Sequence, residues 1–409
     1  MKNILIINHY AGGDKYGMEF RPFYMGRELV KLGYNVTVLA ASFSHLRRVQ
    51  PDVSKDFEEE IIDGVRFVWV KTPSYKKNDH MRLFNVLNFY FKVKRKAKML
   101  ARKYSPDIVI GSSTYPQDMY LANKICRFSG AKSVFEVHDI WPMTLISIHG
   151  MSESNPLIKM IQKGEHYAIS QSDGIISILE HVNLHIQELG YTDFKFFPLP
   201  NGVYIGNNRP APQEYTDLIK QLKQDGNFIV MYLGGFAVAN ALEELIDSAA
   251  FLPDNVKIVM VGDGFLKKQY QKTAEEKGYK NVIFLPFIEK PQINDMLSQA
   301  DCLYIGAKKQ DIYRYGVGMN KLCDYMLAKK PIIYGVETTD SPVKKAGCGI
   351  EIAAESSSAI AGAVVQLMHM SEQQRLQMGE NAYAYVLENH EYSMLAKKFA
   401  DALLEIEKG

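Results

Sequence analysis

Short runs of β-branched and aliphatic residues recur along this chain, and each run ends in polar residues or glycine. The first run, Ile4–Ile7, leads into the pair Gly12-Gly13. A helical spacing of apolar residues follows from about Met18 to Leu32, and Val36–Leu39 is a second short run. A continuous apolar run is typical of a parallel strand that is buried on both faces. The opening segment therefore predicts a β-α-β unit with a glycine-rich loop after its first strand.

The same pattern starts again in the second half of the chain, where Phe228–Leu233 runs directly into Gly234-Gly235. Further runs that we predict as strands are 107–110, 133–137, 174–178, 256–261, 282–285, 302–305 and 331–334, and residues 370–408 have a helical pattern. A chain of 409 residues exceeds what one hydrophobic core usually organises. We predict an α/β protein of two Rossmann-like domains, with parallel sheets facing an interdomain cleft. Ligands of such sheets bind beyond the carboxyl ends of the strands.

We place the N-terminal domain at residues 1–205 and the C-terminal domain at 206–385. Residues 386–409 are predicted to form a C-terminal helix that packs back on the N-terminal domain.

Composition and charge argue against several classes of protein. The formal net charge is +2, which does not favour a protein that binds nucleic acid through a general excess of basic residues. Four cysteines lie far apart and form no C-x-x-C pair, so we expect neither a disulfide framework nor a zinc site; they are Cys126, Cys302, Cys323 and Cys348. Neither a secretion signal nor a membrane-spanning run is evident, and we expect a cytoplasmic protein. No Asp-x-Asp pair occurs, and we predict no metal.

One segment suggests a membrane surface. Residues 81–91 are rich in aromatic and aliphatic side chains at helical spacing, and 92–103 are rich in lysine and arginine. An amphipathic helix of this kind can lie on an anionic leaflet, such as the inner face of the cell membrane. It can equally pack its apolar face on the first sheet and keep its lysines in water.

The segment from Gly316 to Asp324 has the features of a diphosphate site. Gly316 and Gly318 allow a tight turn, and a helix is expected to begin near Asn320. The first amides of a helix and the positive end of its dipole bind anions, and Lys321 adds charge. Asp324 lies one turn after Asn320, where its carboxylate can accept hydrogen bonds from vicinal ribose hydroxyls. The alternative is that Asp324 is an ordinary surface residue.

In combination these segments resemble the retaining, GT-B-fold glycosyltransferases of family 4, especially bacterial capsule and exopolysaccharide (O-antigen-type) members. The resemblance covers most of the chain. It rests on the order and spacing of Gly12-Gly13, of 135–142 (FEVHDIWP), of 199–203 (LPNGV), of 234–242 and of 316–326 before Lys330-Pro331. It implies an acceptor-binding N-terminal domain and a C-terminal domain that binds a nucleotide-sugar, by family habit a UDP-sugar. The nucleotide-sugar is a substrate, so no cofactor is expected.

Two residues are predicted to act in catalysis. His138 directly follows the strand 133–137, and the resemblance implies that it contacts the donor sugar near the anomeric carbon. A single histidine is otherwise often structural. Lys321 is predicted to stabilise the leaving diphosphate.

The sequence departs from the family pattern in the donor site. Many members carry Arg and Lys, five residues apart, where this chain has Gly235 and Asn240. Neutralisation of the diphosphate is then expected to fall to backbone amides, to Lys321 and to Arg314. The acidic residue expected eight positions before Asp324 is replaced by Gly316, and Tyr315 is predicted to supply sugar contacts instead.

Other candidate contacts are more general. Ile288, after the strand 282–285, is placed to cover the base, although core packing explains it equally well. Gly12-Gly13 allows a close approach to the donor, or simply makes a tight turn. Arg21, His45 and Arg47 are predicted to line the acceptor entrance, because cations are dense in these loops.

The sequence therefore predicts a retaining glycosyltransferase that uses a saccharide or polyprenyl-diphosphate-linked acceptor in surface polysaccharide synthesis, of the hexosyl or aminosugar class. A nucleotide-sugar 2-epimerase shares the fold and the donor cleft and remains an alternative, as does a non-catalytic nucleotide-binding scaffold. A dinucleotide oxidoreductase is disfavoured, because no G-x-G-x-x-G follows the first strand.

Overall fold

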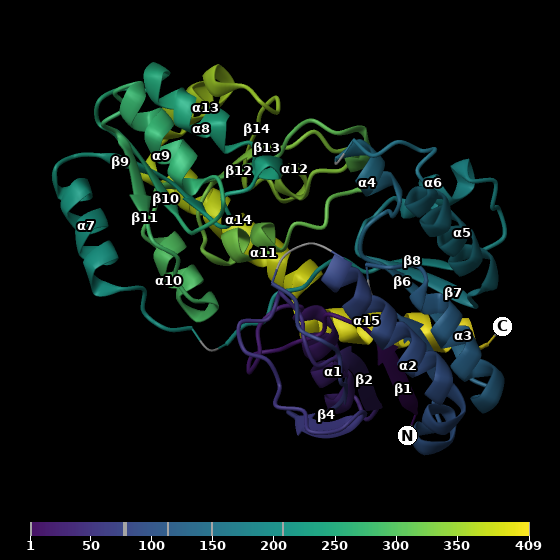
Figure 1. The fold of residues 1–409 in the computed structure, drawn as a ribbon. Coiled ribbons are helices and arrows are strands. Elements are labelled where there is room, and N and C mark those ends of the chain that lie inside the picture. Colours follow the sequence, from purple (N-terminus) through teal and green to yellow (C-terminus); the bar gives the residue numbers. More distant parts are fainter. Residues whose placement is uncertain (1, 77–79, 113, 149, 207, 409) are drawn as a thin grey trace. The chain divides into compact units, whose positions relative to one another are not determined.

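The computed structural model of the chain describes residues 2–76, 80–112, 114–148, 150–206 and 208–408 (Figure 1). It divides into two compact units. The first comprises Met1–Gly202, Tyr315–Gly318 and Tyr392–Gly409, and the second comprises Val203–Arg314 and Met319–Glu391.

The first unit is built on an eight-stranded sheet with the order β3-β4-β2-β1-β5-β6-β7-β8. All neighbouring strands are parallel except β3 and β4. The strands are β1 (Asn3–Ile7), β2 (Asn35–Ala41), β3 (Glu58–Ile62), β4 (Val65–Val70), β5 (Ile108–Gly111), β6 (Lys132–Val137), β7 (Gly174–Ser177) and β8 (Phe196–Pro198). The central strands are apolar because helices cover both faces of the sheet.

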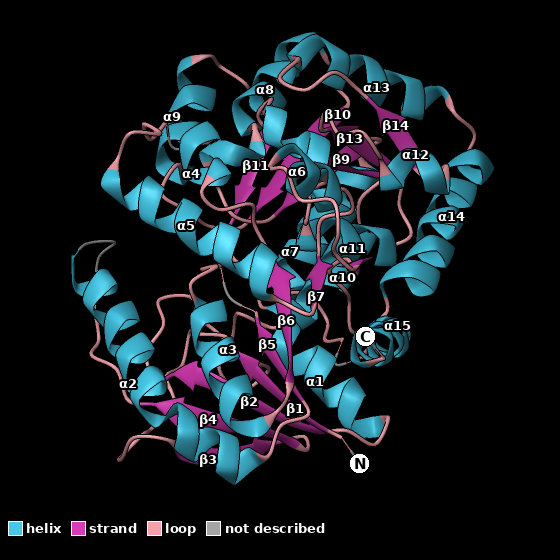
Figure 2. Ribbon diagram, turned by 90° about the vertical axis from the view of Figure 1, so that its right-hand side faces the viewer, coloured by secondary structure: helices cyan, strands magenta, loops and turns pink. Residues whose placement is uncertain are grey.

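Helices α1 and α15 pack together in this unit, as do α2 and α3 (Figure 2). Tyr24 of α1 and Tyr392 of α15 have ring centroids 5.2 Å apart. The helices are α1 (Arg21–Lys31), α2 (His80–Tyr104), α3 (Asp118–Ser129), α4 (Met143–Ser147), α5 (Pro156–Gln171), α6 (Val182–Glu188) and α15 (Tyr392–Glu407).

The second unit contains a six-stranded, fully parallel sheet with the order β11-β10-β9-β12-β13-β14. The strands are β9 (Phe228–Leu233), β10 (Val256–Val261), β11 (Val282–Leu285), β12 (Cys302–Gly306), β13 (Ile332–Gly335) and β14 (Gly349–Glu351). Its α-helices are α7 (Gln213–Gln224), α8 (Leu242–Asp247), α9 (Lys267–Glu276), α10 (Ile293–Ser298), α11 (Asn320–Leu327), α12 (Pro342–Ala346), α13 (Ser357–His369) and α14 (Glu372–His390). Short 3-10 turns are η1 (Val238–Asn240), η2 (Ser248–Phe251), η3 (Lys290–Gln292) and η4 (Asp311–Tyr315), which ends in the first unit.

These observations confirm the predicted α/β class with two mainly parallel sheets. Each predicted strand is present within one or two residues of its expected bounds. The expected division fell at 205–206 and 385–386, whereas the compact units change at 202–203 and 391–392. The predicted first helix begins at Arg21 rather than near Met18.

The antiparallel pair β3–β4 was not predicted. The polar run at Glu58–Glu60 does not look like a strand, because β3 is an edge strand that is not buried on either face. The signal that could have revealed it is Asp63-Gly64, where both residues have positive φ (48° and 83°). This dipeptide is the preferred turn of a two-residue hairpin.

Among the described residues, no helix combines the length and the apolar character needed to cross a bilayer.

Candidate functional site

A buried polar cluster lies at the carboxyl end of β6 in the first unit. Glu136 accepts a hydrogen bond from Arg21 Nε at 2.9 Å on Oε1. Its other oxygen, Oε2, accepts from Ser112 Oγ and lies 3.2 Å from His138 Nε2. Ser112 Oγ is also 3.2 Å from that nitrogen. His138 therefore contacts a buried carboxylate and a buried hydroxyl, and a buried arginine binds the same carboxylate.

The charge of Arg21 is what keeps Glu136 ionised. Burial alone would raise the pKa of this carboxyl, but Arg21 and the hydrogen bonds of His138 and Ser112 hold its pKa below the usual range. Arg21 also donates to the carbonyl oxygens of Leu199 (2.9 Å) and Pro200 (2.7 Å) and is only 2% exposed. The prediction that Arg21 lines the acceptor entrance is not supported, because its guanidinium is committed to these buried partners.

His45 and Arg47 occupy different environments in the loop after β2. His45 is exposed, and its Nδ1 lies 2.8 Å from the hydroxyl of Tyr75. Arg47 is 4% exposed, stacks over the ring of Trp69 at 5.1 Å and donates to Ala41 O. Burial lowers the pKa of Arg47 to about 9. As folded, Arg47 cannot touch an acceptor directly, whereas His45 is accessible.

The Gly12-Gly13 pair makes a tight loop. The amide of Gly12 donates to Glu19 O and that of Gly13 to Gly17 O, both at 2.8 Å. A Cβ on Gly12 would lie 2.0 Å from Gly17 O, so the backbone itself requires glycine at this position. The tight-turn explanation is thus sufficient, and it leaves room for a ligand contact as well.

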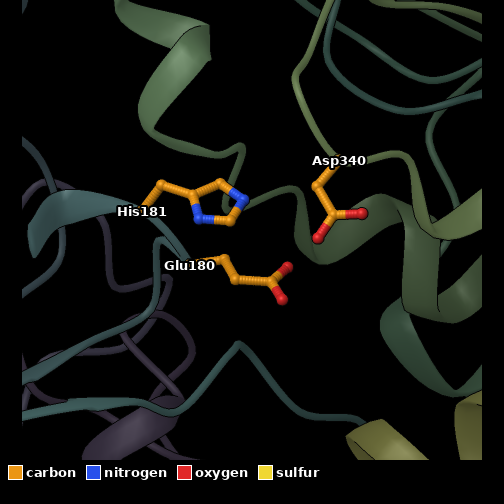
Figure 3. A group of neighbouring side chains, drawn as sticks. All are labelled: Glu180, His181 and Asp340. Atoms are coloured by element: carbon orange, nitrogen blue, oxygen red, sulfur yellow. The ribbon is translucent and has the colours of Figure 1, made fainter. Parts of the chain in front are cut away.

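The loop Tyr315–Gly318 packs against the residues that follow β7. The amide of His181 donates to Tyr315 O at 2.9 Å, and the side chain of Asn201 donates to Gly318 O at 3.1 Å. A Cβ on Gly316 would lie 2.8 Å from the amide nitrogen of Glu180. Figure 3 shows the side chains of Glu180 and His181 extending from this turn. Close packing therefore explains Gly316 and Gly318 without any ligand.

Tyr315 is part of that packing. It is fully buried, its ring meets the ring of His185 edge-on at 5.4 Å, and its hydroxyl donates to Glu188. The predicted contact of Tyr315 with a sugar is therefore not available in this structure. The preceding Arg314 is exposed, and its carbonyl oxygen accepts from Thr339 Oγ1 at 2.7 Å.

In the second unit, three of the predicted donor-site residues come together beyond β9. Lys321 Nζ donates to Asn240 Oδ1 at 2.9 Å and to the hydroxyl of Tyr232 at 3.1 Å. Tyr232 and Asn240 in turn donate to Gly235 O, at 2.7 and 2.8 Å. A Cβ on Gly234 would lie 3.0 Å from Lys321 Cε, so glycine makes room for the lysine stem.

Lys321 has neutral partners. Its ammonium also lies 4.6 Å from the centroid of the Tyr232 ring, and none of the described residues places a carboxylate in an ion pair with it. Burial lowers the pKa of Lys321 to about 8. The helix that carries it, α11, starts without a side-chain cap and without an acidic residue in its first turn. Both features favour an anion here.

The other predicted donor-site residues have various surroundings. Asn320, the first residue of α11, is exposed. Both carboxylate oxygens of Asp324 lie 2.6 Å from Lys290 Nζ. Ile288 is 3% exposed and belongs to the packed interior, whereas the neighbouring Phe287 is 57% exposed.

Sequence reasoning missed four of these contributors: Ser112, Glu136, Tyr232 and Lys290. Ser112 and Glu136 lie at the ends of neighbouring strands, so their positions relative to strand ends were a usable signal. Tyr232 lies inside an apolar run and gave no signal of its own.

Comparisons with known proteins agree with this geometry. Residues 16–206 match the family model Glycosyltransferase Family 4, and residues 215–385 match Glycosyl transferases group 1. The Escherichia coli (strain K12) protein WcaI, assigned as a colanic acid biosynthesis glycosyl transferase, is 22% identical over 262 residues, or 60% of this chain. The chain spans 62% of that relative's length.

Solved structures share the fold over nearly the whole chain. Anabaena HepE, crystallised with UDP and glucose, superposes with a TM-score of 0.68 at 15% identity and covers 99% of this chain and 100% of its own. Sucrose-phosphate synthase from Thermosynechococcus elongatus superposes with a TM-score of 0.73 at 14% identity, covering 99% of each chain. The chain thus matches two glycosyltransferase family models in succession and has the fold of the GT-B glycosyltransferases.

Proposed function

We propose that this protein is a retaining glycosyltransferase that takes its sugar from a nucleotide-sugar, a UDP-sugar, without a metal. Its acceptor is a saccharide or a lipid-linked saccharide in surface polysaccharide synthesis. The observation that carries the proposal is Lys321, a partly buried cation whose hydrogen-bond partners among the described residues are neutral, beside the Gly234-Gly235 loop and the start of α11. The crystallisation of HepE with UDP and the colanic acid assignment of WcaI support the choice of substrates.

A diphosphate is the ligand that best matches this environment. Removing a lysine from water without a counter-ion is costly, so a doubly charged leaving group gains from meeting it there. Tyr232 and Asn240 fix the ammonium before any ligand arrives, because their other hydrogen bonds go to Gly235 O. A cation held in place in this way stabilises charge as it develops on the departing phosphate, with little reorganisation.

The proposed reaction needs no covalent intermediate. The acceptor oxygen forms a bond to the anomeric carbon on the face from which the diphosphate leaves, and the bond from that carbon to the phosphate oxygen breaks. The acceptor's proton passes to the departing phosphate oxygen. The protein supplies positioning and electrostatic stabilisation, the dominant contributions in transfers of this type.

The first test is incubation with a panel of UDP-sugars, with and without saccharide acceptors, in the presence of a chelator. We expect an acceptor-dependent product with the anomeric configuration of the donor, formed at the same rate with the chelator. Conversion of the donor alone to an epimer would favour a 2-epimerase, and UDP binding without turnover would favour a scaffold. Loss of activity that magnesium restores would contradict the metal-free mechanism.

The lowered pKa of Lys321 predicts how UDP affinity depends on pH. The diphosphate is fully ionised above about pH 7, since its last pKa is near 6. Raising the pH through about 8 removes the charge of Lys321, so the affinity for UDP should fall there. The fall should approach about tenfold per pH unit, because one proton is coupled to binding.

Calorimetric titrations of UDP from pH 6.5 to 9.5 would measure this fall. Lys321→Arg is the matched variant, because arginine stays charged throughout this range and should give a nearly flat profile. Identical profiles for the wild type and Lys321→Arg would remove Lys321 from the diphosphate site.

The ion pair between Asp324 and Lys290 makes the ribose role of Asp324 testable. Asp324→Ala should weaken UDP binding by about 1–3 kcal/mol, because ribose hydroxyls lose their acceptor. The variant should also lose the preference for UDP over 2′-deoxy-UDP. Lys290→Met breaks the same ion pair but leaves the carboxylate, so it should keep that preference. If both variants retain it, Asp324 serves only the ion pair.

We further propose that α2 contacts a membrane surface. The residues Leu83, Phe84, Leu87 and Phe91 are between 40% and 58% exposed, while Phe89 and Val93 on the other side of the helix are buried. Lys94, Arg95 and Lys98 follow on the helix, and none forms an ion pair with a described residue. Beside them is a groove of about 460 Å³ that is lined by aromatic and basic side chains: Tyr90, Lys94, Tyr120, Lys124, Arg127, Phe128 and Tyr167.

Vesicle sedimentation tests this contact. We expect binding to vesicles that contain phosphatidylglycerol and much weaker binding to pure phosphatidylcholine, with salt reducing the former. Phe84→Glu combined with Phe91→Glu should abolish binding while leaving UDP affinity unchanged. The control variant Phe251→Glu changes a phenylalanine of the second unit that is 61% exposed. It should have no effect on sedimentation. Equal binding of all three proteins would contradict the role of α2.

A further inference from the structure

The buried cluster beneath His138 determines which of its ring nitrogens carries a proton. We infer that Glu136 is a positioning residue, which holds His138 with its proton on Nε2 so that Nδ1 offers a lone pair to a substrate hydroxyl. This inference rests on the proposed sugar transfer for its use of a hydroxyl. The arrangement of donors and acceptors in the cluster carries the assignment of the proton.

Every donor near Glu136 can be assigned. Arg21 is a donor only, and its nitrogens face Glu136 Oε1, Leu199 O and Pro200 O. Ser112 has a single hydroxyl proton, which it donates to Glu136 Oε2. What remains near His138 Nε2 are lone pairs, on Glu136 Oε2 and on Ser112 Oγ, each at 3.2 Å.

A nitrogen that faces two acceptor oxygens must be the donor. An unprotonated Nε2 would place its lone pair against an ionised carboxylate, which is repulsive in a buried setting. In its neutral form the ring therefore carries its proton on Nε2, and Nδ1 is then the acceptor. Nδ1 has no hydrogen-bond partner among the residues that the structure describes, and the side chain of His138 is 11% exposed.

A second pair in the same unit shows what a purely structural arrangement looks like. Glu165 and His185 are 2.8 Å apart, and both side chains are 8% exposed. No arginine is paired with Glu165 among the described residues, and the His185 ring packs against Tyr315. The Glu136–His138 pair differs because Arg21 also binds the carboxylate of Glu136. This contact keeps the carboxylate ionised and fixed in orientation.

Glu136→Gln is the decisive substitution, because it keeps the shape and inverts the hydrogen bonding. Arg21 can only donate, so the amide oxygen of the new side chain must face Arg21. The amide NH₂ then faces His138 Nε2, which must become an acceptor. The proton moves to Nδ1, and the nitrogen that served a hydroxyl as acceptor becomes a donor.

Long-range ¹H–¹⁵N spectra of protein labelled at histidine measure the tautomer without any substrate, and the His138→Gln variant assigns the signals. We expect the Nε2–H form in the wild type and the Nδ1–H form in Glu136→Gln. Glu165→Gln is the matched control and should leave the His138 signals unchanged. A wild-type His138 in the Nδ1–H form would overturn the inference, even if Glu136→Gln failed to fold.

Steady-state kinetics test whether His138 Nδ1 acts in the proposed sugar transfer. With a UDP-sugar and an acceptor, Glu136→Gln should lower kcat by about 10- to 100-fold with a smaller change in KM, as for other residues that orient a histidine. Glu136→Asp should recover part of the loss. A changed tautomer with unchanged kcat would overturn the role in transfer. If no UDP-sugar is turned over at all, the proposed function fails, while the spectra still decide the tautomer.

Discussion

The parallel strands of both sheets are mainly apolar, and this constraint places most of the polar chemistry of each unit at or near the strand ends. In the first unit, Ser112 follows β5 and His138 follows β6, and the register of these neighbouring strands brings the two side chains to the same edge. In the second unit, the Gly234-Gly235 loop follows β9. A side chain on a buried strand can only join such a site from its last residues, as Glu136 does. Both clusters are thus consequences of the sheets as much as of their own residues.

The cluster around Glu136 and the cluster around Lys321 differ in their balance of charge. Around Glu136 the charges cancel, since Arg21 balances the carboxylate and all strong donors have partners. A closed network of this kind is rigid, because removing one member would leave a buried charge unpaired. Around Lys321 the charge does not cancel, and its partners are a phenol and an amide. The first arrangement suits the orientation of a side chain, and the second suits the attraction of an anion.

Much of the fold followed from the sequence because apolar runs, glycine loops and helical spacing are local signals. The grouping of Gly235, Asn240 and Lys321 was also predictable, since each was assigned to the donor site from its own motif. Contacts between residues that are far apart in the sequence were not predictable. Arg21 and Glu136 are 115 residues apart, and nothing near Arg21 indicates that it is buried. A cation in a loop looks the same in sequence whether it faces solvent or a carboxylate. Tyr315 misled for a related reason, because an aromatic residue beside glycines resembles a ligand contact and in fact fills the interior.

The departures from the family pattern acquire a physical explanation at Asn240. The resemblance leads one to expect cations at this position and at Gly235, so the proposed diphosphate site lacks two of the expected charges. An amide at position 240 cannot neutralise phosphate, but its oxygen holds Lys321 and its nitrogen holds the loop carbonyl of Gly235. A cationic side chain at position 240 would lack the oxygen that accepts from Lys321 and would repel the ammonium. Asn240 and Lys321 therefore belong to one arrangement, in which the described partners of the ammonium are neutral. An ammonium that is partly withdrawn from water interacts more strongly with an anion than a fully solvated one does.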